Sequence, residues 1–125
     1  MKTETVQGAT FEEWSPDEVE AALKAGEIVV VDVRTPAEFI LERIPGALLA
    51  PMAEFDPDSM PTGDRKRIVL HCGSGARSRK VSERCVAAGW TRVAHLEGGM
   101  AAWKQAEKPR LATDLATGQP KRVGG

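Results

Sequence analysis

The sequence contains little of what commits a chain to a special environment. Its 125 residues include two cysteines, no tyrosine and 5% aromatic residues, and its formal net charge is -1. Two cysteines in a chain long enough to bury its own core do not suggest a disulfide framework. The near-neutral charge gives no general attraction to nucleic acid or to an anionic membrane. The composition therefore predicts an ordinary globular protein with free thiols.

Long apolar runs are also missing. No stretch approaches the length needed to span a membrane, and the opening MKTETVQGAT has no apolar segment of the kind found in a signal peptide. We therefore expect a cytoplasmic protein with no membrane partner and no nucleic-acid partner. With 42% apolar and 28% charged residues, the chain has the balance of a folded domain.

Helix-start signals and apolar runs alternate along the chain. Residues 28–33, IVVVDV, are typical of a strand that is covered on both faces. Capping-box patterns at 15–18 (SPDE) and 35–38 (TPAE) predict one helix before and one after this strand. The remaining expected elements are strands at 48–50, 68–70 and 92–96, helices at 77–88 and from 98 to before 109, a loop over 51–66 with one turn near 52–55, and a mobile tail at 110–125. Such alternation predicts an α/β fold with parallel strands and helices on both faces, although it does not fix the strand order.

Cys72 follows one of the predicted strands, at the end of a parallel sheet where ligands bind. Gly73, Ser74 and Gly75 come next, and then a predicted helix. Glycines allow a loop to curl so that several N–H groups point inward, and the helix adds the positive end of its dipole. A thiolate at the rim of such a loop has a lowered pKa and is a good nucleophile. We therefore favour a catalytic role for Cys72 over that of a small buried apolar residue.

The other cysteine and the two histidines have structural interpretations. Cys85 shares a predicted helix face with Val81 and Ala88, which indicates a core residue. His71 precedes the candidate nucleophile on a strand, where adjacent side chains point to opposite faces, so it is not expected to be the general base. The cysteines are separated in sequence, and His71 and His95 lie on different predicted strands, so no metal site is expected.

Four segments, VVVDVRTPAEF, IPGA, HCGSGARS and LEGGMAAW, together resemble the ordered signature of a single-domain rhodanese, a family of sulfurtransferases. The resemblance covers residues 10–109 and leaves an N-terminal extension, 1–9, and the tail, 110–125. It implies a rhodanese-like, doubly wound sheet of about five mainly parallel strands. It also implies that the Cys72 thiolate takes sulfur from an anionic donor and passes it, from a persulfide, to a nucleophilic acceptor. No cofactor and no metal are implied.

The resemblance also implies roles for the residues around the nucleophile. The predicted persulfide-binding loop consists of Gly73, Ser74, Gly75, Ala76, Arg77 and Ser78. Its N–H groups would stabilise the anionic persulfide, and the Arg77 guanidinium would bind a sulfonate or carboxylate of the donor. Asp32 and Arg34 match the family's Asp-x-Arg segment: Arg34 is expected to support the pocket or pair with Glu38, and Asp32 to fix backbone or arginine geometry. A purely structural role fits both equally well, and Trp103 is expected in the core.

The sulfur donor and acceptor stay open. The sequence from Cys72 to Gly75 resembles the loop of mercaptopyruvate-using members, but Ala76-Arg77 departs from the usual ending, so thiosulfate and 3-mercaptopyruvate types are both retained. The acceptor is either a small thiophile or a sulfur-carrier protein. Glu42-Arg43 stand where the family usually has Gly-His, which leaves the local loop geometry open.

Two other functions compete with sulfur transfer. The first is a rhodanese-fold interaction or redox-sensing module without turnover, although inactive members of the family often lack the cysteine. The second is a phosphatase, because phosphatases and arsenate reductases that share the fold also use His-Cys. Those enzymes place five residues between cysteine and arginine, whereas four separate Cys72 from Arg77 here. The shorter loop disfavours the phosphatase interpretation.

Overall fold

The computed structural model describes residues 1–60 and 66–124. Positions 61–65 of the predicted loop and position 125 of the predicted tail lie outside the described residues. Over 51–60 the chain forms two short 3₁₀ helices, η1 (Met52–Glu54) and η2 (Pro57–Ser59), the first of which corresponds to the predicted turn.

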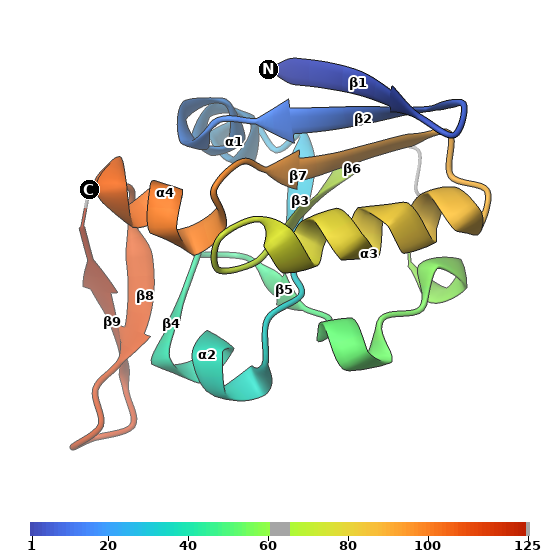
Figure 1. Cartoon of the computed structure of the whole chain (residues 1–125). Coiled ribbons are helices and arrows are strands. Elements are labelled where there is room, and N and C mark those ends of the chain that lie inside the picture. Colours follow the sequence, from blue (N-terminus) through green and yellow to red (C-terminus); the bar gives the residue numbers. More distant parts are fainter. Residues whose placement is uncertain (61–65, 125) are drawn as a thin grey trace.

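A central sheet carries the strands in the order β1-β2-β7-β6-β3-β5 (Figure 1). Their bounds are β1 (Lys2–Val6), β2 (Ala9–Trp14), β3 (Ile28–Asp32), β5 (Leu48–Leu49), β6 (Arg67–His71) and β7 (Arg92–Leu96). β1 is antiparallel to β2, and every other neighbouring pair is parallel. The α/β prediction with about five parallel strands is confirmed. The extension at 1–9 adds an antiparallel edge strand, and β2 had no counterpart among the predicted strands.

The helices are α1 (Pro16–Lys24), α2 (Pro36–Leu41), α3 (Ala76–Ala87) and α4 (Gly99–Gln105). Of these, α1 and α2 begin where the capping boxes placed them, whereas α3 and α4 follow glycine N-caps. The Ser15 hydroxyl accepts from the Glu18 N–H while the Glu18 carboxylate accepts from the Ser15 N–H, and Thr35 and Glu38 repeat this reciprocal pattern. Within the ranges 1–60 and 66–124, no helix has the length and apolar character needed to cross a bilayer.

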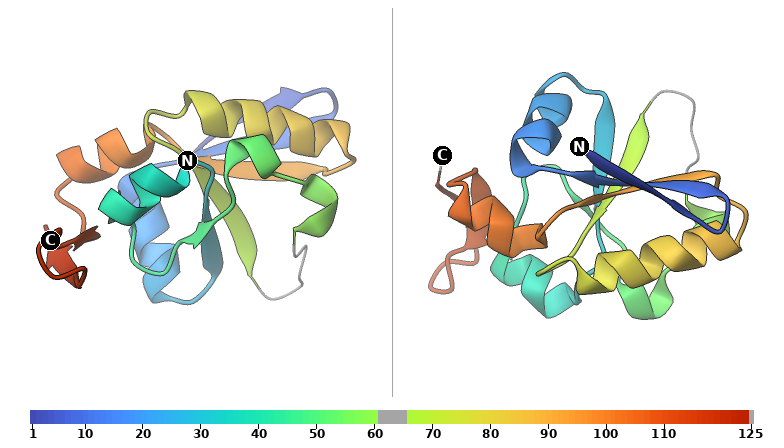
Figure 2. Two further views of the ribbon diagram at one scale, coloured as in Figure 1. Left: turned by 90° about the horizontal axis from the view of Figure 1, so that it is seen from below. Right: turned by 45° about the horizontal axis from the view of Figure 1, so that its top comes forward.

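Apolar layers lie on both faces of the sheet, as a doubly wound fold requires. In and just after β3, Ile28 and Val30 belong to one buried cluster, whereas Val31 and Val33 belong to the other. The first cluster includes Val19 and Ala22 of α1 and Met100 and Trp103 of α4, and the second includes Val81 and Cys85 of α3. Figure 2 shows α1 and α3 on opposite sides of the sheet. The predicted core positions of Trp103 and Cys85 are confirmed, while Ala88 is exposed.

The C-terminal segment differs from the expected mobile tail. Strands β8 (Arg110–Thr113) and β9 (Pro120–Val123) form an antiparallel hairpin, and β8 pairs with β4 (Glu42–Arg43) (Figure 1). The Arg110 Nε donates to a Glu42 carboxylate oxygen over 2.8 Å. The Thr, Gly and Gln content that suggested a tail belongs largely to the turn of this hairpin, where the Gly118 N–H donates to the Asp114 carbonyl over 2.7 Å. Glu42-Arg43, which replace the usual Gly-His, thus supply the strand that holds the hairpin.

The strand order creates a place for a site. From β3 the chain moves outward to β5 and then returns to β6 on the other side of β3, so the direction of winding reverses between β3 and β6. Ligands bind at such a reversal, outside the carboxyl ends of the strands. Asp32 and His71 are register partners at these two ends, and Cys72 is the next residue of the chain.

Candidate active site

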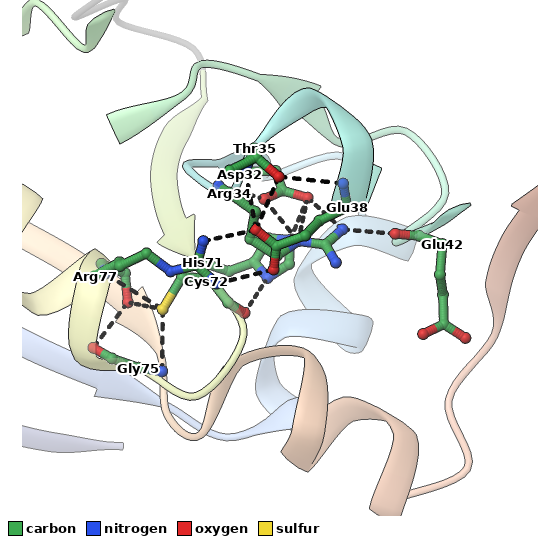
Figure 3. Close-up of polar contacts among 10 residues, drawn as sticks. Asp32, Arg34, Thr35, Glu38, Glu42, His71, Cys72, Gly75 and Arg77 are labelled. Atoms are coloured by element: carbon green, nitrogen blue, oxygen red, sulfur yellow. Dashed lines mark hydrogen bonds and ion pairs between the residues drawn. The ribbon is translucent and has the colours of Figure 1, made fainter. Parts of the chain in front are cut away.

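The loop after β6 curls around the Cys72 sulfur (Figure 3). The Gly75 N–H donates to Sγ over 3.0 Å, the Ser78 N–H donates over 3.3 Å, and Ser78 Oγ lies 3.5 Å from the sulfur. Gly75 has φ of 107°, a left-handed conformation that glycine adopts without strain and that turns its N–H toward the sulfur. Gly75 is also the N-cap residue of α3, so the first turn of this helix faces the same atom.

The loop lowers the pKa of the Cys72 thiol. Burial alone raises that pKa, because it removes water from the thiolate, but the hydrogen bonds from the Ser78 side chain and from the Ser78, Gly75 and Ser74 backbones outweigh burial. The Cys72 side chain is nevertheless fully buried in the second apolar cluster. The site therefore combines a stabilised thiolate with a covered sulfur atom. Ser74 and Ala76 are the exposed residues of the loop, and Gly73 is half-buried.

A pair of glycines fixes the loop from the other side. The N–H groups of Met100 and Ala101 donate to the carbonyls of Cys72 and Gly73 over 2.8 and 3.0 Å. A Cβ atom on Gly99 would lie 2.3 Å from the Cys72 carbonyl oxygen, so only glycine allows the start of α4 to approach this closely. The family-like Gly-Gly segment thus holds the backbone of Cys72 and Gly73 rather than contacting the Cys72 sulfur.

Arg77 is held by Glu38, an acid that the sequence had offered as one of two alternative roles for Arg34. Its Nη1 and Nη2 donate to the two carboxylate oxygens of Glu38 over 2.7 and 2.9 Å (Figure 3). This bidentate contact lowers the pKa of Glu38 to about 2. A Cβ atom on Gly73 would lie 3.0 Å from Arg77 Nη2, which places the guanidinium beside the loop. The Arg77–Glu38 pair, from α3 and α2, therefore stands next to the loop over the sulfur.

Asp32 and Arg34 form a buried pair behind the loop. Arg34 Nε and Nη2 donate to the Asp32 carboxylate over 3.0 and 2.7 Å, and Nη2 also donates to the Glu42 carbonyl over 2.6 Å. His71 Nε2 lies 3.1 Å from Asp32 Oδ2 without hydrogen-bond geometry. Burial raises the pKa of Asp32, but His71 and Arg34 outweigh burial and hold it at about 2. Asp32 fixes arginine geometry as predicted, whereas the alternative pairing of Arg34 with Glu38 is not seen.

Two further residues reach the site that sequence analysis did not select. His95 of β7 places Nδ1 2.7 Å from Ser78 Oγ, and its Nε2 lies 3.2 Å from a carboxylate oxygen of Glu13. Glu13 lies in β2, which was not predicted as a strand, so no local pattern linked it to the loop. Across residues 1–60 and 66–124, no group of three or more His, Cys, Asp and Glu side chains could hold a metal ion.

Comparisons with known proteins point to one family. A family model described as the rhodanese-like domain matches residues 15–106. An uncharacterised protein of Synechocystis is 35% identical over 102 residues, which make up 82% of this chain and 57% of that protein. A sulfurtransferase of Allochromatium vinosum is 37% identical over 89 residues, or 70% of this chain and 82% of the relative. This chain thus spans little more than half of the Synechocystis protein and most of the Allochromatium one.

A solved structure extends the likeness beyond the matched segment. The crystal structure of a thiosulfate sulfurtransferase from Pseudomonas aeruginosa superposes with a TM-score of 0.74 and 28% sequence identity, over 92% of this chain and 22% of that one. The fold, the order of the four sequence segments and the family match over 15–106 lead to one conclusion. The chain belongs to the rhodanese-like domain family.

Proposed function

We propose that the protein is a sulfurtransferase that carries sulfane sulfur on Cys72. The observation that carries this proposal is the convergence of the Gly75 and Ser78 N–H groups on the Cys72 sulfur. These donors stabilise negative charge at the position where both a thiolate and a persulfide would hold it. The sulfurtransferase names of two of the similar proteins support the same reaction class.

The first half-reaction loads the enzyme. The Cys72 thiolate attacks the outer sulfur of the donor, so an S–S bond forms at Cys72 while the bond from that sulfur to the rest of the donor breaks. With thiosulfate the leaving group is sulfite. With 3-mercaptopyruvate the C–S bond breaks and its electron pair leaves with carbon, which takes a proton to give pyruvate.

The second half-reaction returns the thiolate. A nucleophilic acceptor attacks the outer sulfur of the persulfide, and the Cys72 sulfur leaves with the electron pair of the S–S bond. The acceptor is cyanide, a small thiol or a sulfur-carrier protein, since each offers a lone pair that can form the new bond to sulfur. Stabilisation of the departing thiolate by the loop lowers the barrier to this step.

Access to the sulfur involves the Arg77–Glu38 pair. The Cys72 side chain is fully buried, whereas the side chains of Arg77 and Glu38 are 33% and 38% exposed. A donor that offers its own sulfonate or carboxylate to Arg77 can replace the Glu38 carboxylate, which would open the loop and place the donor beside it. Arg77→Gln is therefore expected to raise the KM for the donor about tenfold and to change kcat less.

Intact-protein mass spectrometry tests the proposal. The protein is incubated with thiosulfate and, separately, with 3-mercaptopyruvate, with Cys72→Ser and Cys85→Ser as matched variants. We expect the parent and Cys85→Ser to gain the mass of one sulfur atom from at least one donor, to lose it with cyanide, and Cys72→Ser to gain nothing. Loading of Cys72→Ser would contradict the assignment of the nucleophile. Loading of no variant by either donor would favour an interaction module without turnover.

A further inference from the structure

A chain of polar contacts leads from the Cys72 sulfur into the sheet. Cys72 follows β6, and Ser78 Oγ of α3 lies 3.5 Å from its sulfur. The same hydroxyl lies 2.7 Å from His95 Nδ1 of β7, and His95 Nε2 lies 3.2 Å from a Glu13 carboxylate oxygen of β2. Cys72, Ser78 and His95 are at most 3% exposed, so water does not compete freely for the contacts among these three, whereas the Glu13 side chain is 30% exposed. Four side chains from separate parts of the sequence thus form one continuous path.

The carboxylate at the end of the path determines which ring nitrogen carries the proton. Glu13 accepts only, so a neutral His95 keeps its proton on Nε2 and donates it to Glu13. The Nδ1 atom is then an acceptor for the Ser78 hydroxyl. Ser78 Oγ also lies 3.2 Å from the Gly75 carbonyl, a second acceptor for the same proton. With the hydroxyl proton on the His95 side, Ser78 Oγ is free to accept from the Cys72 thiol.

We propose that His95 receives the thiol proton of Cys72 through the Ser78 hydroxyl, with Glu13 holding the imidazole in place. The S–H bond breaks as a proton moves to Ser78 Oγ, and the original hydroxyl proton moves to His95 Nδ1. The products are a thiolate and an imidazolium, and no other reactant is needed. The hydrogen bonds then reverse, because Nδ1–H donates to Oγ and the hydroxyl donates to the thiolate. His95 is a positioning residue in this scheme, since it acts on the sulfur only through Ser78.

The surroundings of His95 fit a proton acceptor that is neutral at rest. Burial lowers the pKa of His95, and the Glu13 carboxylate acts in the opposite direction. Glu97, two positions after His95 in the sequence, also favours the charged ring, whereas Arg79 of α3 disfavours it. The Phe11 ring is an uncharged close neighbour, with its centroid 4.9 Å from that of His95, and Gly75 of the loop also lies beside the imidazole. A nearby thiolate would add its negative charge to that of Glu13 and so further stabilise a buried imidazolium.

This relay concerns the thiol that the proposed function uses, but its test does not require sulfur transfer. The measurement is the rate at which iodoacetamide alkylates Cys72, followed on the Cys72-containing peptide from pH 5 to 9. His95→Asn keeps an oxygen that can accept from the Ser78 hydroxyl but cannot take a proton. We expect its alkylation to be about tenfold slower than that of the parent near pH 6.5, which corresponds to one unit of thiol pKa.

Variants of two carboxylates separate the effect of the Glu13–His95 contact from the effect of negative charge near His95 in general. Glu13→Gln removes the charge that touches Nε2, and about threefold slower alkylation is expected. Glu97→Gln removes a charge that faces His95 without lying on the path, so its rate should stay within about twofold of the parent. Equal effects of the two variants would overturn the assigned role of Glu13. Thermal melting of each variant checks that the fold is kept.

The Ser78→Ala variant tests whether His95 acts through Ser78. If the path is continuous, adding His95→Asn to Ser78→Ala produces no further slowing, whereas independent effects would multiply. Multiplied effects, or parental alkylation in His95→Asn, would overturn the proposal. A parent that loads no sulfur but shows the expected alkylation series would contradict the sulfurtransferase function and keep the relay. A parent that loads sulfur but does not show the expected alkylation series would keep the sulfurtransferase function and reject the relay.

Discussion

The two cysteines mark opposite ends of one helix and behave as opposites. Cys72 precedes α3 and Cys85 lies in its last turn, and both side chains are fully buried in the same apolar cluster. The pKa of Cys85 is raised by burial to about 12, whereas that of Cys72 is lowered. Burial acts in the same direction on both thiols, so it cannot account for the difference.

The difference comes from the backbone around each sulfur. Cys72 faces the N–H groups of a tight loop and of the first turn of α3, before those groups are used by helical hydrogen bonds. Cys85 lies within the helix, where the N–H groups already donate to carbonyls one turn earlier. The opposite pKa shifts of the two thiols therefore follow from the N–H donors around each sulfur rather than from exposure.

Exchanging each cysteine for serine should separate activity from stability. Cys72→Ser is expected to abolish sulfur loading. Its free energy of unfolding should stay within about 1 kcal/mol of the parent value, because the loop N–H groups can donate to the new hydroxyl. Cys85→Ser is expected to load sulfur normally. Its free energy of unfolding should fall by about 1–3 kcal/mol, because the variant buries a hydroxyl in an apolar cluster. Mass spectrometry and urea unfolding measure the two effects. A Cys85→Ser variant that folds normally but no longer loads would show that the second thiol takes part in the reaction.

In the native protein, iodoacetamide should alkylate the two thiols at very different rates. At pH 8 the thiolate fraction of Cys85, with its pKa of about 12, is far smaller than that of Cys72, and we expect at least about a thousandfold difference in rate. The Cys72 rate should already rise below the ordinary thiol range, while the Cys85 rate should stay low until the protein unfolds. Peptide mapping after timed exposure to iodoacetamide measures both. Comparable rates below pH 8 would contradict the account given for the loop.

Features encoded in short stretches of sequence were predictable. The capping boxes at Ser15 and Thr35 act through residues three positions apart, and the β-branched run at 28–33 follows from burial on both faces. The loop of N–H groups around Cys72 was also predictable, because Cys72 and its donors lie within seven consecutive residues. In each case the physical cause lies inside one short segment.

Contacts between distant segments were not predictable in the same way. The Arg77–Glu38 pair joins positions 39 apart in the sequence, and the His95–Glu13 contact joins positions 82 apart. Each depends on strand order, which the hydrophobic pattern leaves open. β2 was not predicted because it buries a charged residue, Glu12, which is atypical of a buried strand. The Glu12 carboxylate accepts hydrogen bonds from Trp14 of the same strand and from the distant residues Arg67 and Arg92. Residues 110–123 escaped because their partner strand, β4, is only two residues long.

Alanine at two glycines should show which end of α3 depends on a close backbone approach. Gly89 follows the Cys85 end and Gly99 supports the Cys72 end, and both have positive φ. Gly89→Ala meets no atom within 4 Å, so about 1–2 kcal/mol of backbone strain is expected. The alanine side chain of Gly99→Ala would also collide with the Cys72 carbonyl. We therefore expect the free energy of unfolding to fall by about 3 kcal/mol or more, together with a loss of sulfur loading. Urea unfolding and mass spectrometry distinguish the two, and equal losses of stability would argue against the close approach.

The smallest expected effect concerns the arginine near each cysteine. Arg77 donates to the Glu38 carboxylate, whereas Arg84 donates to the Met52 carbonyl over 2.7 Å. The pKa of Glu38 falls from its usual 4.5 to about 2 in the folded protein, so its pair stabilises the fold above about pH 4.5 and loses this effect as the pH falls toward 2. Because both side chains are about one-third exposed, Glu38→Gln should cost less than about 1 kcal/mol at pH 7.

Acid should therefore separate the two arginines. The stability difference between the parent and Glu38→Gln should shrink between pH 5 and pH 3, because below about pH 4.5 the unfolded parent takes up a proton at Glu38 that the folded parent, with a Glu38 pKa of about 2, does not. Arg84→Gln is the matched control. Because the Met52 carbonyl does not titrate, the stability lost with this hydrogen bond should be the same at every pH. Urea unfolding at pH 7, 5 and 3 gives the three differences. A Glu38→Gln difference that grows on acidification would mean that the carboxylate is destabilising where it stands, and that Arg77 is held beside the loop by something other than its partner on α2.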